Sequence, residues 1–439
     1  MLKLTGTAIP SAWLLAGHRG KERTPDSNPL ATASQLRWET LARRIVAAPV
    51  VQAAISEALP VYLRTGAGDP GRGQEAAREL AYATALTAAV SDPYRPGLVM
   101  VADPHRWFGT SVPGARFGWV NPDNIYRWGL VDPASQYRIR GKRRYPGPKD
   151  VNISLLTNIY IPETIGNLAY NELQVASDGT FTVTIDSSPA NGRPNHLQMT
   201  AGTTTVLVRN SMDDWATQNP DALSIERVGG PPAPSPLTLD QMAAISADSI
   251  ALAVPFNANG FSTTTVPLNA FNTPPPAGQT PYALVTQRSA QCRFQLADSQ
   301  ALVVQATLGG SGYFTLPVTD PFGVSIHPGP LQSSLNNFQA DANADGSYTL
   351  VMCAQDPGVH NWLDTGGVQS GTLDARWQLL PSPDSDLSIS GQLVNFQDLA
   401  SVLPPQLPRV SPAQRAHELK QRNAAFLRRF QVPVPGGHG

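Results

Sequence analysis

The chain has little charge, few cysteines and no long apolar run. Only 15% of its 439 residues are charged, and its 32 basic residues nearly balance its 33 acidic ones. This balance gives no overall field that would favour nucleic acid or an anionic membrane as a partner. No stretch approaches the ~18 consecutive apolar residues of a membrane helix, and residues 1–20 lack the apolar core of a secretory signal. The sequence therefore predicts a soluble, cytoplasmic protein.

The common catalytic motifs are also absent. The sequence has no GxxxxGKS/T phosphate loop, no GxGxxG opening a helix, no GxSxG elbow and no HExxH. These absences disfavour nucleotide-dependent transfer, dinucleotide redox chemistry, and the commonest serine-hydrolase and zinc-protease layouts. The only cysteines, Cys292 and Cys353, lie in apolar runs without CxxC or Cys/His spacing. We expect buried thiols, no structural metal and no cofactor.

Turn-forming residues are plentiful instead. The 41 prolines and 36 glycines favour many turns over long helices. Helical spacing of apolar residues occurs over 34–45 and 74–90, and capping boxes at Thr238–Gln241 and Ser411–Gln414 open a short helix and a C-terminal helix. Pro49 is interpreted as the start of a turn. The C-terminal helix has one apolar face and many basic residues, which predicts docking onto the body and leaves a separate partner site as the alternative.

The remaining segments have the texture of strands. Residues 180–185 and 204–209 alternate between apolar and polar side chains, as half-exposed strands do. A mainly β fold of two related antiparallel sandwich or jelly-roll-like units follows. The predicted segments are a helical and irregular region (1–95), a first β-sandwich unit (96–230), a Pro-rich and helical linker (231–258), a second β-sandwich unit (259–400), and a C-terminal helix and tail (401–439).

An internal repeat supports the two units. Three landmarks recur at offsets of 167, 166 and 167 residues: Asp178-Gly179 as Asp345-Gly346, Asn195 as Asn361, and Arg209 as Arg376. In each copy Asp-Gly supplies a tight turn, because Gly tolerates positive φ, and an alternating strand follows it. Near-constant spacing over several landmarks predicts two pseudo-symmetric antiparallel sandwiches.

The second copy resembles a known family. Residues Ser333–Asn336, the Ala344–Gly346 turn and the segment Asp356–Gly367, which contains Asn-Trp-Leu, resemble the bacterial domain-of-unknown-function 1214 family. In that family the Asn-Trp-Leu tripeptide follows a strand begun at an Asp-Gly turn, and a later strand carries an Arg, which corresponds here to Arg376. The resemblance covers roughly residues 280–385.

The first copy, at roughly 120–210, resembles the same family more weakly. Its segments Asn124–Arg127 and Tyr137–Gly141 are similar to the beginning of such domains, but His196 stands where the second copy has Trp362. The resemblance implies a β-sandwich or jelly-roll architecture. It implies no chemistry, so no catalytic role is transferred from it.

Two clusters could form a site, and the first lies between residues 103 and 140. Arg offers a two-pronged fork to an acidic group, and aromatic rings supply a stacking wall. The alternative is an Arg-aromatic stack that stabilises a loop-rich junction. The candidates here are His105 as acid or base and Arg127, Arg138, Tyr126, Trp128 and Trp107 as substrate-binding residues.

The second cluster is the loop from Asp356 to Asp364. His360 can serve as an acid or base near neutral pH, with Asp356 or Asp364 as its carboxylate partner, and Asn336 and His327 lie upstream as substrate-binding candidates. The alternative is structural. In it, Asp356 and the recurrent Asn of this loop cap backbone amides, and the Trp fills the end of the sandwich.

Two metal sites receive weaker support. Asp341, Asn343 and Asp345 match the opening of a calcium loop, but Met352 occupies the twelfth position, where that loop needs Glu. An ordinary hairpin turn is the better interpretation. The histidines show no i,i+2 or i,i+4 pair that would support a transition-metal site.

Two functions remain. The first is an enzyme without a nucleotide cofactor that performs acid/base chemistry (hydrolysis, elimination or isomerisation) on a small, partly apolar molecule. The second is a non-catalytic β-sandwich that binds a carbohydrate or another metabolite. The expected partner is a small-molecule ligand, and a homo-oligomer is left open. A histidine held against a carboxylate in an enclosed pocket favours the enzyme, whereas aromatic rings lying flat on a groove favour the binding protein.

Overall fold

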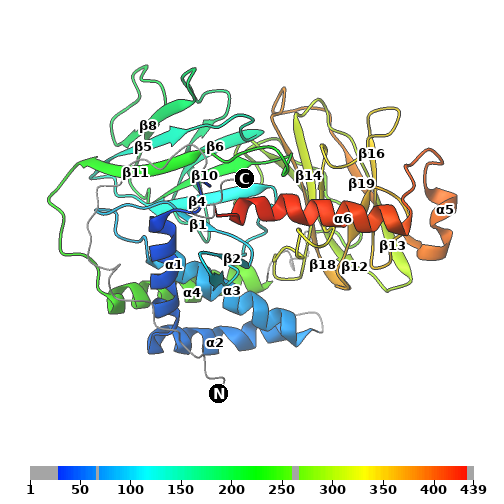
Figure 1. The fold of residues 1–439 in the computed structure, drawn as a ribbon, viewed down its shortest axis with the longest axis horizontal. Helices are drawn as coiled ribbons and strands as arrows, with labels where there is room; N and C mark the ends of the chain where they lie inside the picture. The colour runs from blue at the N-terminus through cyan, green and yellow to red at the C-terminus, as the bar shows by residue number, and fades with distance from the viewer. Residues whose placement is uncertain (1–27, 66–68, 260–265, 433–439) are drawn as a thin grey trace, which may run out of the picture.

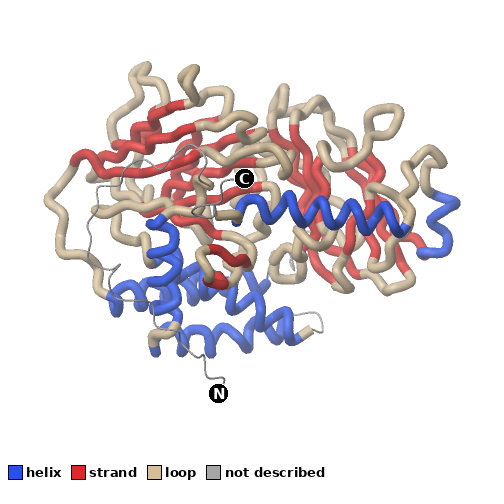
Figure 2. Tube along the Cα trace, in the orientation of Figure 1, coloured by secondary structure: helices blue, strands red, loops and turns tan. Residues whose placement is uncertain are grey.

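Strands dominate the architecture. The computed structural model describes residues 28–65, 69–259 and 266–432. Two β blocks lie side by side, a layer of helices lies below the first block, and the helix α6 runs across both (Figure 1). Figure 2 shows the same division, with strands filling both blocks and most helices gathered on one side. The predicted mainly β fold with helical N-terminal and C-terminal segments is confirmed.

The helical layer joins sequence-distant helices: α1 (Ala33–Val46), α2 (Pro49–Thr65), α3 (Pro70–Ala88) and α4 (Leu239–Asn259). The expectation of a turn at Pro49 was wrong, because this proline is the first residue of α2, where its missing N–H costs nothing. The capping box at Thr238 is confirmed, since Gln241 N donates to Thr238 Oγ1 at 3.3 Å. The helix it opens packs against α2 and α3, so the 231–258 segment contributes to the helical layer.

No single helix in the described ranges has the length and apolar character needed to cross a membrane. Residues Ala33–Val46 and Pro49–Arg64 meet that requirement only when they are taken together, across a bend of 73°.

The first β unit consists of two sheets packed face to face. Their inner faces bury side chains such as Ile139, Ile153, Val183 and Val208. The first sheet has the order β1 (Val99–Val101), β4 (Asn124–Leu130), β10 (Thr205–Ser211), β6 (Asp150–Leu156) and β7 (Thr164–Ala169). The second sheet has the order β11 (Ala222–Gly229), β5 (Gln136–Lys142), β8 (Thr180–Asp186) and β9 (His196–Gln198). A hairpin of β2 (His105–Trp107) and β3 (Thr110–Val112) leads into the unit.

The second β unit repeats this arrangement except for β1, which has no counterpart in the sheet equivalent to its own. One sheet has the order β12 (Arg288–Gln295), β18 (Ser370–Gln378), β14 (Tyr313–Thr319) and β15 (Ser334–Asn336). The other, listed in the same direction as its counterpart, has β19 (Ile389–Asn395), β13 (Gln300–Ala306), β16 (Tyr348–Cys353) and β17 (Trp362–Asp364). The orders match those of β4-β10-β6-β7 and β11-β5-β8-β9, so the predicted internal repeat is confirmed. Both cysteines are free and buried, as expected.

The recurrent Asn has the same structural task in both units. Asn361 accepts from Asp341 N at 2.8 Å and donates to Asp341 O at 2.7 Å. Asn195 makes the same two bonds with the backbone of Gln174, both at 2.8 Å. Each Asn therefore replaces one rung of backbone pairing beside the short parallel strand, which confirms the structural interpretation of this residue.

Asn361 also donates to the buried carbonyl of Thr349 at 3.0 Å. We expect Asn361→Ala to lower the free energy of unfolding by about 2–3 kcal/mol, because a buried carbonyl loses its partner. Urea unfolding monitored by tryptophan fluorescence measures this change. The matched control is Asn171→Ala, at an exposed position of the first unit, whose cost should stay below about 1 kcal/mol. Equal costs for the two variants would contradict the assigned role.

The two β units are joined by polar contacts on their facing sheets. Ser211 Oγ donates to Gln378 Oε1 at 3.2 Å, and these residues are 167 positions apart, so equivalent strands of the two units meet. Tyr313 of the second unit donates to the buried Asp123 of the first at 2.6 Å, and Asn121 Nδ2 donates to Tyr313 Oη at 2.8 Å. The contacts fix the units relative to one another.

The C-terminal helix α6 (Pro412–Leu427) fastens both units. It begins with the predicted capping box at Ser411. Arg415 donates to Val359 O of the second unit, Arg422 to Pro328 O at 2.8 Å, and Arg428, just after the helix, to Trp215 O of the first unit at 3.2 Å. Docking onto the body is confirmed, because these guanidinium groups satisfy backbone carbonyls of the protein itself.

Candidate functional site

A cavity of about 410 Å³ lies between the two β units. We call it the inter-unit chamber. Its walls are the facing sheets, through β4 and β10 of the first unit and β12 and β18 of the second. Residues 117–120, residues 280–284 and the end of α4 also border it. A volume of this size accommodates a small organic molecule.

Strand alternation directs one arginine from each unit to this chamber. On β10, Val206 and Val208 face the sandwich core, so Arg209 lies on the opposite face. On β18, Ala375 and Trp377 face the second core, so Arg376 lies on the chamber face. Arg209 and Arg376 are equivalent positions of the repeat. The repeat therefore places two guanidinium groups in the walls of one cavity.

Several polar atoms of the chamber wall are buried without a hydrogen-bond partner among the described residues. Arg376 uses Nη2 to donate to Trp119 O and to pair with Asp374 Oδ2 at 2.7 Å. Its Nη1 and the Oδ1 of Asp374 have no such partner, and neither do Asn124 Oδ1 and Thr280 Oγ1. Buried polar atoms normally find partners, so this concentration indicates a place where a ligand or ordered water completes the network.

The lining of the chamber contains two arginines and one aspartate. Arg209 donates to Ser154 Oγ at 3.1 Å rather than to a carboxylate. Its pKa is lowered by burial and by the charge of Arg376, while Tyr126 and Asp150 oppose the shift. Burial raises the pKa of Asp374, and its ion pair with Arg376 opposes that shift. Two arginines facing one aspartate favour an anionic occupant.

Aromatic side chains form the rest of the wall. Trp119 packs edge-to-face against Phe256 at 5.6 Å, and Phe256 packs in the same way against Tyr282 at 5.2 Å. Phe117 and Trp128 make a third edge-to-face pair at 6.0 Å. Trp119 is further anchored by its indole N–H, which donates to Thr372 Oγ1 at 2.8 Å. The wall therefore suits a ligand with an apolar or aromatic body.

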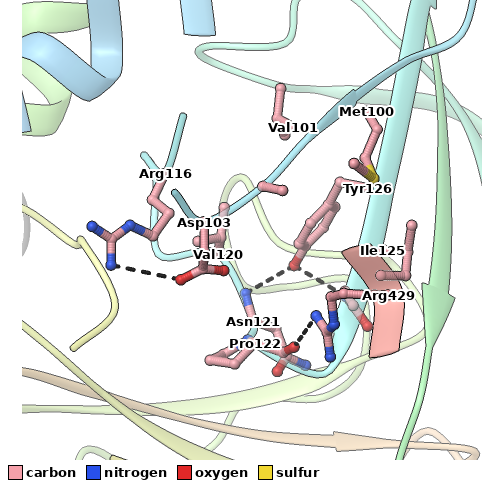
Figure 3. Close-up of a pocket in the computed structure, with 12 residues that line it drawn as sticks. Met100, Val101, Asp103, Arg116, Val120, Asn121, Pro122, Ile125, Tyr126 and Arg429 are labelled. Carbon is pink, nitrogen blue, oxygen red and sulfur yellow. Dashed lines mark hydrogen bonds and ion pairs between the residues drawn. The ribbon is translucent and has the colours of Figure 1, made fainter. Parts of the chain in front are cut away.

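A second, much smaller cavity lies next to the chamber (Figure 3). Its volume of about 20 Å³ holds little more than a water molecule. Tyr126 lines both cavities, and its hydroxyl accepts from Asn121 N and Asn124 Nδ2, each at 3.0 Å. Arg429 donates to Pro122 O at 3.0 Å on the far side. This small cavity is therefore part of the packing behind the chamber.

The chamber receives only two residues of the first predicted cluster, Tyr126 and Trp128. Arg127 lies between them on β4, so alternation turns it to the sandwich interior, where it donates to Asp221 O at 2.6 Å. Burial lowers the pKa of Arg127 to about 10. Arg138 lies on β5, where it pairs with Glu226 at 3.3 Å. Neither arginine is among the residues that line the chamber.

His105 and Trp107 lie in the packed joint between α1 and the C-terminal segment. Trp107 donates to the buried Glu39 at 2.9 Å. The ring of His105 stacks on Phe430 at 4.2 Å, and its side chain is 3% exposed. Burial lowers the pKa of His105 to about 4, and the carbonyl of Asp103 opposes that shift. The geometry is that of a core histidine.

We expect this histidine to make stability depend on pH. Its folded pKa of about 4 lies below the ordinary 6.5, so between these values the unfolded chain binds the additional proton. The stabilising effect of neutral His105 is present above pH 6.5 and is lost as the pH falls towards 4. From pH 7 to 4.5, the wild type should lose about 2–3 kcal/mol more unfolding free energy than His105→Phe. Urea titrations at both pH values measure it, and parallel losses would contradict it.

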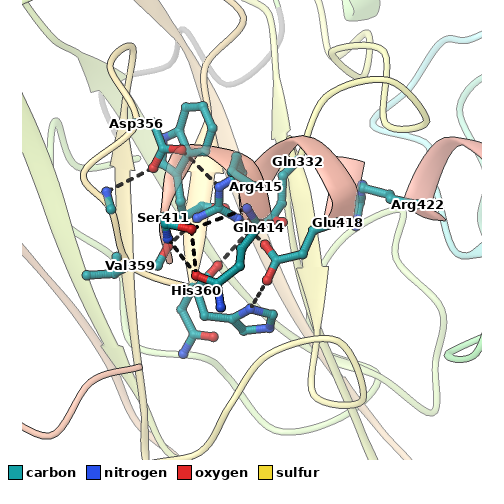
Figure 4. A network of polar contacts seen from close by, with 12 residues as sticks. Gln332, Asp356, Val359, His360, Ser411, Gln414, Arg415, Glu418 and Arg422 are labelled. Atoms are coloured by element: carbon teal, nitrogen blue, oxygen red, sulfur yellow. Dashed lines mark hydrogen bonds and ion pairs between the residues drawn. The ribbon is translucent and has the colours of Figure 1, made fainter. Parts of the chain in front are cut away.

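The second predicted cluster forms a docking site for α6 (Figure 4). His360 Nδ1 lies 3.2 Å from Glu418 Oε1, and its Nε2 lies 3.0 Å from Gln339 O. Asp356 pairs with Arg415 at 3.0 Å and accepts from Gly358 N at 2.9 Å. The polar groups of this loop are therefore used to hold α6, and none of them lines the inter-unit chamber.

The other predicted residues have local tasks. Asp364 accepts from Gly366 N at 2.7 Å, and burial raises its pKa. Asn336 donates to Asp213 O at 2.9 Å across the joint between the units. His327 is exposed, in a turn with φ of 36°. None of the three is brought into contact with the chamber.

The segment with the calcium-like spacing forms a hairpin turn. Asp345 accepts from Ser347 N at 3.0 Å, and Asn343 donates to Ser347 Oγ at 2.9 Å. No group of three or more His, Cys, Asp or Glu side chains with metal-binding geometry occurs among the described residues.

Four residues that line the chamber were not predicted as site residues from the sequence: Arg209, Arg376, Asp374 and Trp119. The signal was present for three of them. Arg209 and Arg376 were landmarks of the repeat, and alternation with the apolar residues beside them predicts that both leave the sandwich cores. Asp374 follows by the same alternation. The position of Trp119 depends on a loop contact that local patterns do not specify.

Comparisons with known proteins give a fold but no activity. No family model matches the chain, and no curated protein sequence matches it. Among solved structures, it is similar to an uncharacterized protein from Burkholderia cenocepacia, with a TM-score of 0.68 and 22% identity over 82% of this chain and 100% of that chain. The VPA0106 protein from Vibrio parahaemolyticus matches with a TM-score of 0.38 and 10% identity, over 62% of this chain and 90% of that chain. The Burkholderia protein shares the fold, but a sequence identity of 22% does not indicate a shared function.

Proposed function

We propose that this protein binds a small organic anion with an apolar or aromatic body in the inter-unit chamber. The observation that carries the proposal is the pair of repeat-related arginines, Arg209 and Arg376, in the wall of one cavity of about 410 Å³. The buried Nη1 of Arg376 has no hydrogen-bond partner among the described residues. A carboxylate or phosphate would accept from this atom and would compensate the excess charge.

The residues that line the chamber favour a binding protein over an enzyme that uses histidine as its acid or base. Among the described residues no histidine lines it, and His105 and His360 are both engaged in packing or in holding α6. Aromatic rings and arginine forks are a common way to bind an anionic metabolite. Membership of the domain-of-unknown-function 1214 family is a further proposal, based on the residues around Asn361.

Matched acids and amides test the proposal. The wild-type protein is heated with 3-phenylpropanoate, phenyl phosphate, or the uncharged 3-phenylpropanamide. Binding to the folded state raises the melting temperature, and a ligand at 100 times its Kd adds about 2.7 kcal/mol to the unfolding free energy. We expect at least one acid to stabilise the protein and the amide to have no effect at the same concentration. Equal effects of the acid and its amide would contradict an anion site.

One observation favours an enzyme as the second candidate. Asp374 is a buried carboxyl group in the chamber wall, and burial raises its pKa, as is common for catalytic acids and bases. Acid/base chemistry on the bound anion, of the hydrolase, lyase or isomerase type, would then depend on Asp374 rather than on a histidine. Incubation of each stabilising ligand with the protein, followed by mass spectrometry, distinguishes turnover from binding.

A further inference from the structure

One ion pair on β18 has two buried hydrogen-bonding atoms without partners among the described residues. Arg376 and Asp374 are two residues apart on one strand, so their side chains share a face, and Arg376 Nη2 lies 2.7 Å from Asp374 Oδ2. The other terminal atoms, Nη1 of Arg376 and Oδ1 of Asp374, have no hydrogen-bond partner among the described residues. The two residues are 6% and 7% exposed. The chamber wall thus presents one donor and one acceptor from a single ion pair.

This juxtaposition specifies the groups of the ligand. A carboxylate that accepts from Arg376 Nη1 brings the substituent on its neighbouring carbon close to Asp374 Oδ1, because both protein atoms belong to one ion-paired unit. Asp374 Oδ1 is an acceptor as a carboxylate, so that substituent must be a donor. We infer that the chamber binds a 2-hydroxy acid, with its carboxylate at Arg376 and its hydroxyl at Asp374, an inference that rests on the proposed anion-binding function.

Charge favours a hydroxyl over an ammonium group. The lining of the chamber contains Arg209, Arg376 and Asp374, and it carries one positive charge in excess when all three are ionised. Asp150 interacts with Arg209 from outside this lining. A 2-hydroxy acid carries one negative charge and compensates this excess, whereas a 2-amino acid is neutral overall and does not. The position equivalent to Asp374 in the first unit is Leu207, so only one wall offers the carboxylate, and the apolar body of the ligand lies towards the other.

The test uses acids that differ only beside the carboxylate. Isothermal titration of the wild type compares 3-phenyllactate, 3-phenylpropanoate, 2-methoxy-3-phenylpropanoate and phenylalanine. We expect 3-phenyllactate to bind about tenfold or more tightly than 3-phenylpropanoate, because it donates to a charged acceptor. The methoxy acid should lose this advantage, since it cannot donate. The variant Asp374→Leu introduces the residue found at the equivalent position of the first unit, Leu207. In this variant 3-phenyllactate and 3-phenylpropanoate should bind within about twofold of each other.

The outcomes separate this inference from the proposed function. If 3-phenylpropanoate binds and its hydroxylated form gains nothing, the assignment of Asp374 is wrong and the anion site stands. If phenylalanine binds more tightly than 3-phenyllactate, the ligand is an amino acid and the hydroxy-acid assignment is wrong. If none of the four binds, both proposals fail. The comparison with the methoxy acid uses only the wild type, so it decides the question even if Asp374→Leu does not fold.

Discussion

Arg116→Met is expected to lower the free energy of unfolding by about 3–5 kcal/mol, because it leaves the buried carboxylate of Glu79 without its cation. Arg116 is 2% exposed. Its Nε donates to Glu79 at 2.9 Å, its Nη2 to Glu75 at 2.9 Å, and its Nη1 to Ser325 O at 2.7 Å. One guanidinium therefore connects α3, the first β unit and the second β unit. Urea unfolding monitored by circular dichroism measures the loss.

A double variant shows whether the cost comes from the isolated charge. Glu79 is 5% exposed, and burial raises its pKa while Arg116 opposes that shift. Arg116→Met combined with Glu79→Leu removes both charges, and an apolar replacement of a whole buried pair is often close to neutral. The double variant should therefore be more stable than Arg116→Met alone. Arg140→Met, on the exposed face of β5, is the matched control and should change stability by less than about 1 kcal/mol. A loss below that limit in Arg116→Met would contradict the role of this arginine as a joint.

Arg209→Met is expected to weaken the binding of a chamber acid by about 10-fold to 100-fold with little change in the stability of the unliganded protein. A hydrogen bond to a charged group contributes about 1.5–3 kcal/mol, and about 1.4 kcal/mol corresponds to a factor of ten in affinity. In the unliganded protein Arg209 has Ser154 Oγ as a side-chain partner and lies near the charge of Arg376. Its removal relieves this repulsion and also removes the attraction to Asp150. These two effects oppose one another, so the melting temperature without ligand should change little.

Isothermal titration with 3-phenylpropanoate measures the affinity, and a thermal scan measures stability. Arg140→Met serves again as the control, because Arg140 lies on the opposite sheet of the first unit and pairs with Glu226 at 2.9 Å. It should leave both quantities unchanged. If Arg209→Met binds 3-phenylpropanoate as tightly as the wild type does, Arg209 does not contact the ligand.

Most of the fold could be predicted because its signals are local or repeated. Asp-Gly turns, alternating strands and capping boxes act within a few residues, and the constant offset of 167 residues between Arg209 and Arg376 already indicated two equivalent units. The helix α2 was missed because Pro49 was interpreted as a turn former, although proline is also favoured at the first position of a helix. Both roles are compatible with the same local sequence.

The candidate site was harder to predict. A cluster of polar and aromatic residues in the sequence does not show which way each side chain points in the fold. Arg127 was selected for its aromatic neighbours, but a strand sends it to the opposite face from Tyr126 and Trp128. His360 and Asp356 were selected for their proximity in sequence. Their partners Glu418 and Arg415 lie on α6, 58 and 59 residues away in the chain, where no local pattern relates them to the loop. Alternation, applied to the repeated arginines, is the rule that points to the chamber.

The most direct test of anion binding in the inter-unit chamber is a crystal structure of the protein soaked with 3-(4-iodophenyl)propanoate, with the iodine located by its anomalous signal. We expect an iodine peak inside the inter-unit chamber, with the carboxylate accepting hydrogen bonds from Arg376 and Arg209 and the ring against the aromatic wall. An iodine peak elsewhere, with the chamber filled by ordered water at a ligand concentration that saturates binding in solution, would contradict the claim that this chamber is the binding site.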